Sequence, residues 1–420
     1  MIQALRGTKD ILPYEIRIWQ YIHDQVQHVL QLANYEEIRT PVIENTSLFE
    51  RSIGNDTDII NKEMYSFIDQ GSRKITLRPE GTASIARAFI SNNLYKFNRI
   101  QRLWYLGPMF RYERPQQGRQ RQFHQLGIEC LGSKSPLADA EVIRLAILIL
   151  ERLEYPAYSL EINSIGNTEE RKIYKEKLIQ YLEPYINDLD QDSQKRLYTN
   201  PLRILDTKNL KTQEILLEGP KLKSCLNQDS LKHFNQLCQH LNDLQIVFSI
   251  NDYLIRGLDY YNYTAFEIKN SSIGQQNTIC GGGRYDQLIT QLGGPQTPAV
   301  GWAIGIERLI LEISEKIQIN KNKPIYIAIQ GFEAYRNIWN IVNILEKQNI
   351  KFEIDLSNSS FHKQLKKANS LQVDICMIFG DNEVANNTVI IKWLNTGQQK
   401  CIDINHLASY LYYIKSYLIT

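Results

Sequence analysis

The chain has 420 residues, of which 43% are apolar, 10% aromatic and 22% charged. This composition is typical of a globular protein and argues against a disordered one, and the length exceeds what one hydrophobic core usually serves, so we expect two or three domains. The formal net charge of +2 gives no global signature for nucleic acid, so any such partner has to be bound by a local basic patch.

The first predicted elements are a helix and a strand that contains a proline. Apolar residues at helical spacing between Ile18 and Leu30 follow Pro13 and predict an amphipathic helix. The segment 36–44 is predicted to be extended and contains Pro41. Because proline cannot donate a hydrogen bond to a sheet ladder, we expect this strand at the edge of a sheet or at an interface.

A short strand, a helix and a long hairpin come next. Residues 76–78 are predicted as a strand, and the Ala-rich helix that follows has Thr82 as its expected N-cap. Residues 102–111 and 122–129 are predicted as two strands. The loop between them is rich in Arg, Gln, Pro and Gly.

The middle of the chain differs from the preceding segments in composition and in predicted secondary structure. Ser135 as N-cap and Pro136 as first helical residue predict a strong helix. Residues 167–243 are helical in pattern, polar and rich in Lys, Asp, Asn and Gln, which predicts an inserted helical lobe. Strand-like segments then return at residues 254–261, 264–269 and 301–306, with a turn around 281–283.

The last hundred residues predict a separate domain. A Lys/Asn-rich stretch at residues 315–323, ending at Pro324, is expected to be a linker. Beyond it strands and helices alternate, which is the pattern of an α/β domain. The expected strands are 325–330, 351–356, 374–380 and 388–394, and the expected helices are 333–348 and 361–370.

No membrane segment, disulfide framework or protein-bound metal is expected. The chain has no stretch of about 18 apolar residues, and its first eleven residues do not form a signal peptide. Six cysteines are scattered without a CxxC pair, which indicates reduced thiols. The closest Cys/His group fits no common zinc pattern; it comprises Cys225, His233, Cys238 and His240.

The predicted hairpin concentrates positive charge. Arg111 and Glu113 are two residues apart along an expected strand and so share a face. Guanidinium groups suit bidentate phosphate binding, and Phe123 could stack on a base, so the hairpin predicts a polyphosphate site. The alternative is a solvated charge run. The hairpin's arginines are Arg99, Arg102, Arg111, Arg114, Arg119 and Arg121.

Two other segments carry polar groups suited to a pocket. Glu80 and Thr82 stand at a strand-to-helix turn, where they serve either to cap the helix or to bind an ammonium group. Gln125 and Glu129 lie an even number of residues apart on the second hairpin strand, so both face the side of Phe123.

A third segment, residues 256–261, places Arg256 next to Tyr260 and Tyr261 in an apolar context, with Asp259 as a possible acidic partner. The two tyrosines are expected on opposite faces of a strand. The Gly-rich run 281–286 is either a structural turn or a weak phosphate signal. The chain lacks a GxxxxGK[ST] loop, a GxGxxG motif between a strand and a helix, and a GxSxG elbow.

In this order the segments closely resemble histidyl-tRNA synthetase, a class II aminoacyl-tRNA synthetase family. The first class II signature matches residues 14–32 with Pro41, and the second matches residues 110–123. The third matches residues 301–308, with Ala303 where many class II enzymes have glycine. Residues 254–261 and 281–286 match the histidine-specific stretches, which make the resemblance specific.

The resemblance implies an α+β fold: a six-stranded antiparallel class II catalytic sheet flanked by helices, with a helical insertion and a C-terminal α/β anticodon-binding domain. The expected boundaries are 1–318 for the catalytic domain, with the insertion at about 167–243, and 324–420 for the anticodon-binding domain. A homodimer built partly on the first signature is also implied, which would explain a strand with a proline at an interface.

The implied reaction has two steps. ATP activates L-histidine to histidyl-adenylate with release of pyrophosphate, and the histidyl group then passes to the 3′ end of tRNA(His). Mg²⁺ accompanies the nucleotide. The implied catalytic residues are Arg111 and Arg256, which flank the α-phosphate.

The resemblance also distributes the remaining residues over two substrates. Glu80, Thr82 and Gln125 would hold the α-amino group of histidine, with Gly81 and Tyr260 in the same pocket, and Glu129 and Tyr261 would contact the imidazole nitrogens. The nucleotide would be held by Glu113, Arg121 and Phe123, and its outer phosphates by Arg308.

One competing hypothesis and one question of location stay open. The chain could be a catalytically inactive, synthetase-like regulatory subunit that binds histidine or RNA, although it retains the arginines and the C-terminal domain that such proteins tend to lose. The heavy use of Asn, Ile, Lys and Tyr suits an AT-rich genome, so the expected location is the cytoplasm or the interior of an organelle, a plastid among them.

Overall fold

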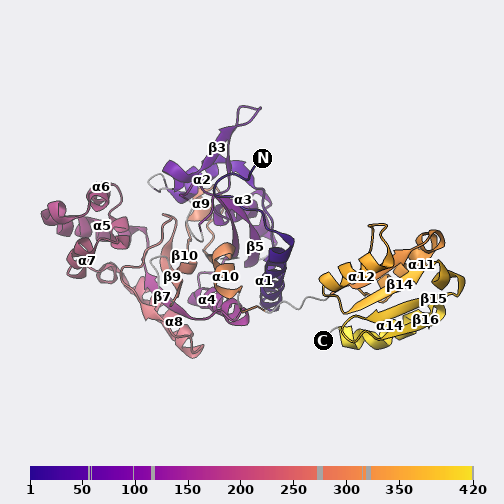
Figure 1. Cartoon of the computed structure of the whole chain (residues 1–420). Helices are drawn as coiled ribbons and strands as arrows, with labels where there is room; N and C mark the ends of the chain where they lie inside the picture. The colour runs from indigo at the N-terminus through magenta and orange to yellow at the C-terminus, as the bar shows by residue number, and fades with distance from the viewer. Residues whose placement is uncertain are drawn as a thin grey trace. The chain divides into compact units, whose positions relative to one another are not determined.

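The computed structural model describes residues 1–54, 57, 59–97, 99–114, 119–271, 278–314, 316–317 and 323–418. The chain divides into two compact units, Met1–Gln318 and Ile319–Thr420, and each is described separately (Figure 1). Within the described ranges no helix is both long enough and apolar enough to cross a membrane.

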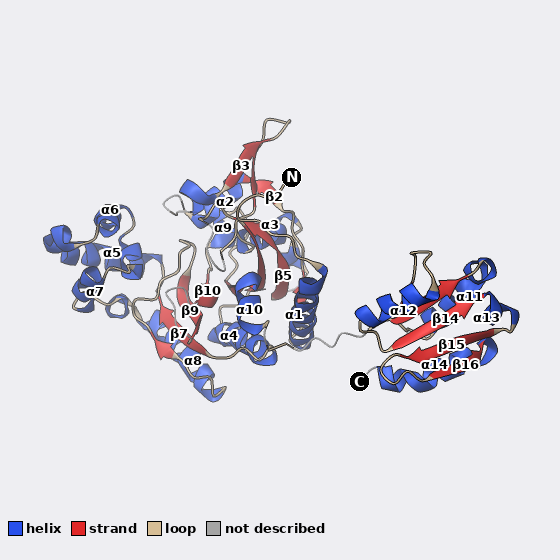
Figure 2. Ribbon diagram, in the orientation of Figure 1, coloured by secondary structure: helices blue, strands red, loops and turns tan. Residues whose placement is uncertain are grey.

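Unit 1 is built on a sheet of eight strands (Figure 2). The six central strands pair antiparallel, as the resemblance implied, and a two-residue strand runs parallel to its neighbour at each edge. The predicted strand 36–44 is wrong as one element: Pro41 lies between the edge strand β1 and the strand Ile43–Asn45 of a separate small sheet. In spatial order the strands are β1 (Glu36–Glu37), β5 (Gln101–Phe110), β6 (Gln122–Leu131), β11 (Ala299–Gly305), β10 (Thr278–Arg284), β9 (Asn262–Asn270), β7 (Tyr158–Ser164) and β8 (Ser249–Ile250).

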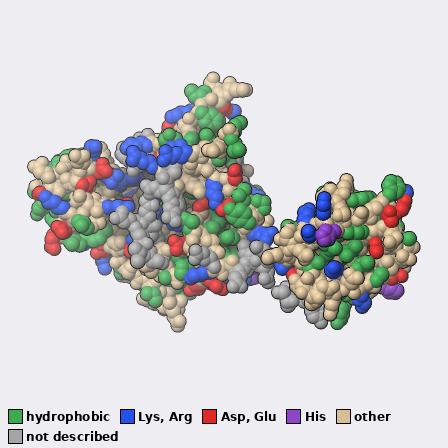
Figure 3. Space-filling view, viewed as in Figure 1, with side chains coloured by type: hydrophobic (Ala, Val, Ile, Leu, Met, Phe, Trp, Pro, Cys, Tyr) green, Lys and Arg blue, Asp and Glu red, His purple; other side chains and the backbone are tan. Residues whose placement is uncertain are grey.

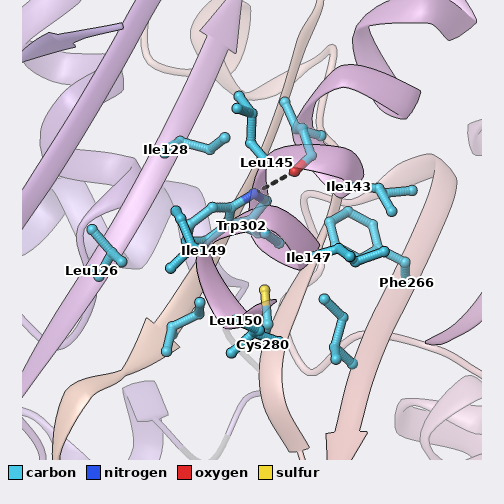
Figure 4. Close-up of a cluster of buried hydrophobic side chains, with 14 of the residues drawn as sticks. Leu126, Ile128, Ile143, Leu145, Ile147, Ile149, Leu150, Phe266, Cys280 and Trp302 are labelled. Carbon is cyan, nitrogen blue, oxygen red and sulfur yellow. Dashed lines mark hydrogen bonds between the residues drawn. The ribbon is translucent and has the colours of Figure 1, made fainter. Parts of the chain in front are cut away.

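One face of this sheet is covered by four helices and forms the main core. These helices are α1 (Pro13–Leu32), α4 (Pro136–Arg152), α8 (Gln228–Asp243) and α10 (Ile306–Ile313). The alternation of β6 directs Leu126 and Ile128 into this core (Figure 4). Trp302 is buried there and donates its indole N–H to the carbonyl of Val142 at 2.7 Å. The predicted start of α4 is confirmed, because Ser135 Oγ accepts from the N–H of Leu137.

The opposite face of the sheet carries a second, smaller core and the polar residues of interest. Helices α3 (Thr82–Ser91) and α9 (Leu288–Gln291) pack over it. Next to α3 lies a three-stranded sheet of β2 (Ile43–Asn45), β4 (Lys74–Leu77) and β3 (Tyr65–Ile68), flanked by α2 (Thr46–Ile53) and the helical turn Ile59–Glu63. Since side chains alternate along a strand, Gln125 and Glu129 of β6 face this second side, as their spacing predicted.

The insertion is helical, as predicted, and has its own core. Helices α5 (Thr168–Leu182), α6 (Gln191–Thr199) and α7 (Leu210–Leu217) lie together beyond β7 (Figure 1). Short 3-10 turns connect them at Glu183–Asp188, Pro201–Asp206 and Leu222–Cys225. Helix α8 behaves differently: its apolar face, with Phe234, Leu237 and Leu241, packs into the main core. The insertion's own core therefore ends before α8.

Unit 2 is an α/β domain with a five-stranded sheet in the order β13-β12-β14-β15-β16. Ile325, Ile327 and Ile329 of β12 face a core shared with α11 and α14, while Tyr326 and Ala328 face α12. The predicted elements correspond to β12 (Ile325–Gln330), α11 (Phe332–Lys347), β13 (Phe352–Ile354), α12 (Phe361–Ser370), β14 (Ile375–Gly380) and β15 (Thr388–Trp393). Three elements were not predicted: α13 (Asp381–Ala385), β16 (Gln399–Asp403) and α14 (Ile404–Leu418).

Candidate active site

A cavity of about 1020 Å³ opens on the second face of the large sheet of unit 1. That is the size of pocket that holds a drug-sized ligand or a nucleotide. Its wall is formed by the β4–α3 turn, the β5–β6 hairpin, the loop before β9, strands β9 to β11, the start of α10 and part of the insertion. In Figure 3, Lys and Arg side chains gather on unit 1 between the insertion and the small sheet.

The β4–α3 turn supplies one end of the cavity. Glu80 accepts hydrogen bonds from the N–H groups of Thr82 and Ala83, both at 2.7 Å, and so caps α3 from outside the helix. The prediction of Thr82 as N-cap is therefore wrong; Gly81 holds that position without a side-chain bond. As Glu80 serves the backbone, the hydroxyl of Thr82 is left to donate to Glu129 Oε1 at 2.7 Å.

Glu129 lies at the bottom of this region, only 1% exposed. It accepts from the hydroxyls of Thr82 and Tyr285. Burial raises the pKa of Glu129 from its ordinary value to about 8, since removal from water penalises the charged form; the two hydroxyls lower it and the charge of Glu80 raises it. The neutral form of Glu129 is therefore favoured more than that of an exposed glutamate.

Tyrosines surround Glu129. The rings of Tyr260 and Tyr261 lie 4.7 Å apart, and both rings meet the edge or face of Tyr285. Tyr105 fills the space between Gly81 and Gly127, where any side chain would collide with its ring. Its buried hydroxyl has no hydrogen-bond partner among the described residues.

The β5–β6 hairpin supplies positive charge next to the β4–α3 turn. Arg111 donates to the carbonyl of Pro79 at 2.9 Å, and its guanidinium lies 5.2 Å from the ring centre of Phe123. Glu113 lies 3.8 Å from Arg111 and 3.1 Å from Arg119. Arg111 and Glu113 thus share a face, as predicted, although β5 ends at Phe110.

The segment 254–261 is not a strand, and that prediction is wrong. It is an irregular loop, and Tyr260 and Tyr261 are buried together instead of facing opposite sides. Arg256 forms an ion pair with Glu267 of β9. Its guanidinium lies over Gly281 of β10, where a side chain would collide with it. The Nε of Arg256 is buried and makes no hydrogen bond within the described chain.

The predicted turn at 281–283 is also wrong, because these glycines lie within strand β10, paired with both β9 and β11. They are small for a packing reason: a side chain on Gly281 would displace Arg256, and one on Gly282 would strike Trp302 and Phe266. At the far end of β10, Arg308 of α10 donates to the carbonyl of Thr278. Burial and the charge of Arg119 lower the pKa of Arg308.

Comparison with known proteins decides the family. The family model described as "Histidyl-tRNA synthetase" matches residues 7–309, and the one described as "Anticodon binding domain" matches residues 324–412. The chain belongs to the histidyl-tRNA synthetase family. A histidine–tRNA ligase, chloroplastic, of Gracilaria tenuistipitata var. liui is 65% identical over 395 residues, covering 94% of each chain. Its counterpart from Pyropia yezoensis is 53% identical and covers 100% of this chain and 97% of its own.

The solved structures agree with this synthetase assignment. The apo histidyl-tRNA synthetase of S. aureus is 36% identical, has a TM-score of 0.82 and covers 98% of this chain and 100% of its own. A Bacillus halodurans protein described as an ATP phosphoribosyltransferase regulatory subunit/histidyl-tRNA synthetase is 22% identical with a TM-score of 0.63, and so supports the fold alone. As a member of this family the chain is an aminoacyl-tRNA ligase for histidine, as the sequence predicted.

In this synthetase the cavity gathers most of the predicted site residues. Those on its wall are Glu80, Thr82, Arg111, Glu113, Phe123, Gln125, Arg256, Tyr260, Tyr261 and Arg308. Gly81, Arg121 and Glu129 are not on the wall: Glu129 lies behind Thr82, and Gly81 lies against Tyr105. The guanidinium of Arg121 lies 3.9 Å from the ring centre of Tyr112, and its Nε donates to the carbonyl of Glu113 at 3.4 Å. The backbone N–H of Arg121 donates to the carbonyl of Gly7.

Three residues near the site were not predicted. Tyr285 lies in the Gly-rich run 281–286, but that run was interpreted only through its glycines, as a turn or a phosphate-binding segment. Tyr105 would have followed from pairing β5 with β6, which sets it opposite Gly127. Glu267 had no sequence signal. Over the described ranges, no cluster of three or more His, Cys, Asp or Glu side chains has the arrangement of a metal site.

Proposed function

We propose that the cavity binds L-histidine at its Glu80–Glu129 end and ATP at its arginine-rich side, and aligns them for adenylate formation. One observation supports the assignment of the two substrates to different parts of the cavity. Two buried polar atoms on the same wall make no hydrogen bond within the described chain: Gln125 Oε1, an acceptor, and Arg256 Nε, a donor. An acceptor suits the ammonium of an amino acid and a guanidinium donor suits a phosphate or carboxylate oxygen.

The amino-acid end is assigned as follows. Glu80, Thr82 and Gln125 all line the cavity, so they offer carboxylate, hydroxyl and amide oxygens to the α-ammonium group. Tyr261, on the wall, contacts one imidazole nitrogen, and Tyr260 shapes the pocket. The contact of Glu129 with the other nitrogen and the place of Gly81 in the pocket stay predictions, because neither residue lies on the wall. A buried polar pair of this kind rejects amino acids that lack a matching side chain, because they would leave it unpaired.

The nucleotide end uses charge and stacking. Arg111 and Arg256 flank the α-phosphate, Arg308 meets the outer phosphates, and Phe123 stacks on the base. Glu113 completes the nucleotide site, and the contribution of Arg121, which is not on the cavity wall, stays a prediction. A carboxylate oxygen of the histidine attacks the α-phosphorus and pyrophosphate leaves. The protein contributes alignment and charge stabilisation and forms no covalent bond.

Mg²⁺ fits this site through Glu113. The carboxylate lines the cavity, and its buried Oε2 makes no hydrogen bond to any described residue, although it forms an ion pair with Arg119 at 3.1 Å. Mg²⁺ prefers hard oxygen ligands and is commonly held by one or two carboxylates together with substrate phosphates. When bound, the ion would share the negative charge of the phosphates.

Histidine-dependent exchange of pyrophosphate into ATP tests the proposal. We expect exchange with L-histidine and Mg²⁺, and none when histidine is omitted or replaced by phenylalanine. Absence of exchange in folded protein would refute it. Glu129→Gln should weaken histidine binding while ATP binding stays intact; an equal loss of both would indicate misfolding.

The remaining partners and the location are proposed on coarser grounds. Unit 2, whose family model is described as an anticodon-binding domain, is proposed to bind tRNA(His). A homodimer is proposed from exposed apolar side chains around the first signature, Tyr14 and Ile43 among them, and sedimentation at several concentrations tests it.

A plastid location is proposed because the relatives at 65%, 53% and 52% identity are named chloroplastic; immunolocalisation tests this.

A further inference from the structure

The loop 251–261 holds Arg256 and Tyr261 at the cavity wall, yet it is not part of the large sheet. A loop without regular pairing has many accessible conformations, and holding one of them requires contacts from elsewhere. The position of Arg256 therefore depends on whatever fixes the loop backbone. Much of this support comes from the insertion.

Two arginines of the insertion donate to carbonyl groups of this loop. Arg203, in the turn Pro201–Asp206, donates to the carbonyl of Gly257, next to Arg256. Arg171, in the first turns of α5, donates to the carbonyl of Tyr261. The two bonds therefore hold the loop on both sides of Tyr260. One is made to the residue after Arg256, and the other is made to Tyr261 itself.

The start of the loop also packs on the insertion. Tyr253 and Ile255 join the insertion's hydrophobic core, and the hydroxyl of Tyr253 donates to the carbonyl of Leu216 of α7 at 3.3 Å. On its other side the loop is held by unit 1 proper, where the N–H of Asp259 donates to the carbonyl of Ile53 at 3.3 Å. The loop is thus clamped between the insertion and α2.

Burial strengthens the contact of Arg171, whereas the bond of Arg203 to Gly257 is exposed. Burial lowers the pKa of Arg171, and the nearby charge of Asp259 raises it, so this guanidinium faces the loop away from bulk water. A charge-assisted bond from a guanidinium to a carbonyl is stronger and more directional than a neutral one. A displacement of about 1 Å at a catalytic group can cost on the order of 10²-fold in rate.

We propose that Arg171 and Arg203 are positioning residues for adenylate formation, which hold loop 251–261 so that Arg256 and Tyr261 face the substrates. The insertion is then part of the amino-acid activation machinery. This inference rests on the proposed function, because it assigns Arg256 its role at the α-phosphate. Neither arginine touches substrate.

The test uses Arg203→Ala in the full chain, with Lys211→Ala as matched control. Lys211 is an exposed cation of the same insertion that pairs with Asp188 and does not line the cavity. We expect Arg203→Ala to lower kcat of histidine-dependent pyrophosphate exchange by about 10- to 100-fold, with KM for ATP changed less than threefold. Arg203→Lys, which keeps a cationic donor, should recover more than half of the kcat that Arg203→Ala loses. Lys211→Ala should match wild type.

A double-mutant cycle shows whether Arg203 acts through Arg256. If it does, Arg203→Ala adds little to the defect of Arg256→Ala, because the group being positioned is already gone. Additive losses would overturn the inference. An unchanged kcat for Arg203→Ala, or a loss equal to that of Lys211→Ala, would overturn it as well.

Hydrogen exchange separates this inference from the proposed function. Arg203→Ala should speed amide exchange in peptides covering 251–261 while those of α5 and α7 keep wild-type protection. Faster exchange throughout the insertion would indicate a general structural role and overturn the inference. Arg171→Ala should likewise speed amide exchange in peptides covering 251–261, and unchanged exchange there would overturn its positioning role. Should Arg171→Ala not fold, Arg171→Lys replaces it in the same measurement. If wild-type protein showed no pyrophosphate exchange, the proposed function would fail, while the amide data would still decide whether the arginines order the loop.

Discussion

Glu129→Gln offers the sharpest test of the buried carboxylate. The substitution keeps the side chain's size and keeps an acceptor for Thr82, whose hydroxyl lies 2.7 Å from Glu129 Oε1. Glutamine cannot ionise, so the variant resembles the protonated form of Glu129. The hydroxyl of Tyr285, which donates to the carboxylate, can accept from the new amide instead.

The expected effect is a change in how stability depends on pH. Burial raises the pKa of Glu129 in the folded protein to about 8, against 4.5 when unfolded. Between these values the folded state binds more protons than the unfolded state, so this group's contribution is full below about pH 4.5 and is lost as the pH rises through 8. The slope is about 1.4 kcal/mol per pH unit, so Glu129→Gln should gain about 3 kcal/mol relative to wild type between pH 5.5 and 7.5.

Calorimetric unfolding of unit 1 at pH 5.5, 6.5 and 7.5 measures this difference. Taking variant minus wild type at each pH cancels the titration of the other groups. Glu161→Gln is the control, since burial raises the pKa of Glu161 but its bonds to Lys269 and Asn251 prevail and lower it. Its carboxyl is ionised in both states throughout this window, so its difference should be flat. A flat difference for Glu129→Gln too would refute the reasoning.

Three further substitutions give distinct outcomes. Arg256→Ala should lower adenylate formation by roughly 10²–10³, the effect of losing one preorganised donor; pyrophosphate exchange measures it, and a near-wild-type rate would show that the residue is misassigned. Tyr285→Phe removes a bond that lowers the pKa of Glu129, so unfolding should show stability lost above pH 8 but little change at pH 5; an equal loss at both would contradict this. Gly127→Ala should cost about 1–3 kcal/mol of unfolding free energy, because its Cβ would collide with Tyr105; Gly305→Ala, with open space around its Cα, is the control, and equal costs would exclude the collision.

Regular elements with a clear period were predictable. The apolar alternation in 122–129 identified β6 and its two faces, and the Ser135-Pro136 start of α4 followed from capping chemistry alone. In unit 2 the buried strands were found, whereas β16, a largely exposed edge strand, was missed because it has no apolar alternation to detect. The order of polar motifs was enough to indicate the family.

The errors share a physical cause, which is that local patterns do not say what a residue packs against. The apolar residues of 254–261 suggested a strand, but they are buried because the loop lies between the insertion and α2. Thr82 looked like an N-cap, but Glu80 reaches the same N–H groups. The glycines 281–283 suggested a turn, but they are small because Arg256 and Trp302 occupy the space beside them.

By itself the sequence determined the two units and the types of side chain that the chemistry needs, because these depend on periodicity and on residue type. The class II architecture followed from the resemblance of its motifs to a known family. Only the tertiary structure decided which of these side chains meet. The pairing of Arg256 with Glu267, the burial of Glu129 behind Thr82 and the support of loop 251–261 by Arg171 and Arg203 join residues far apart in the chain. Such contacts are set by the packing of whole elements, and no local pattern records them.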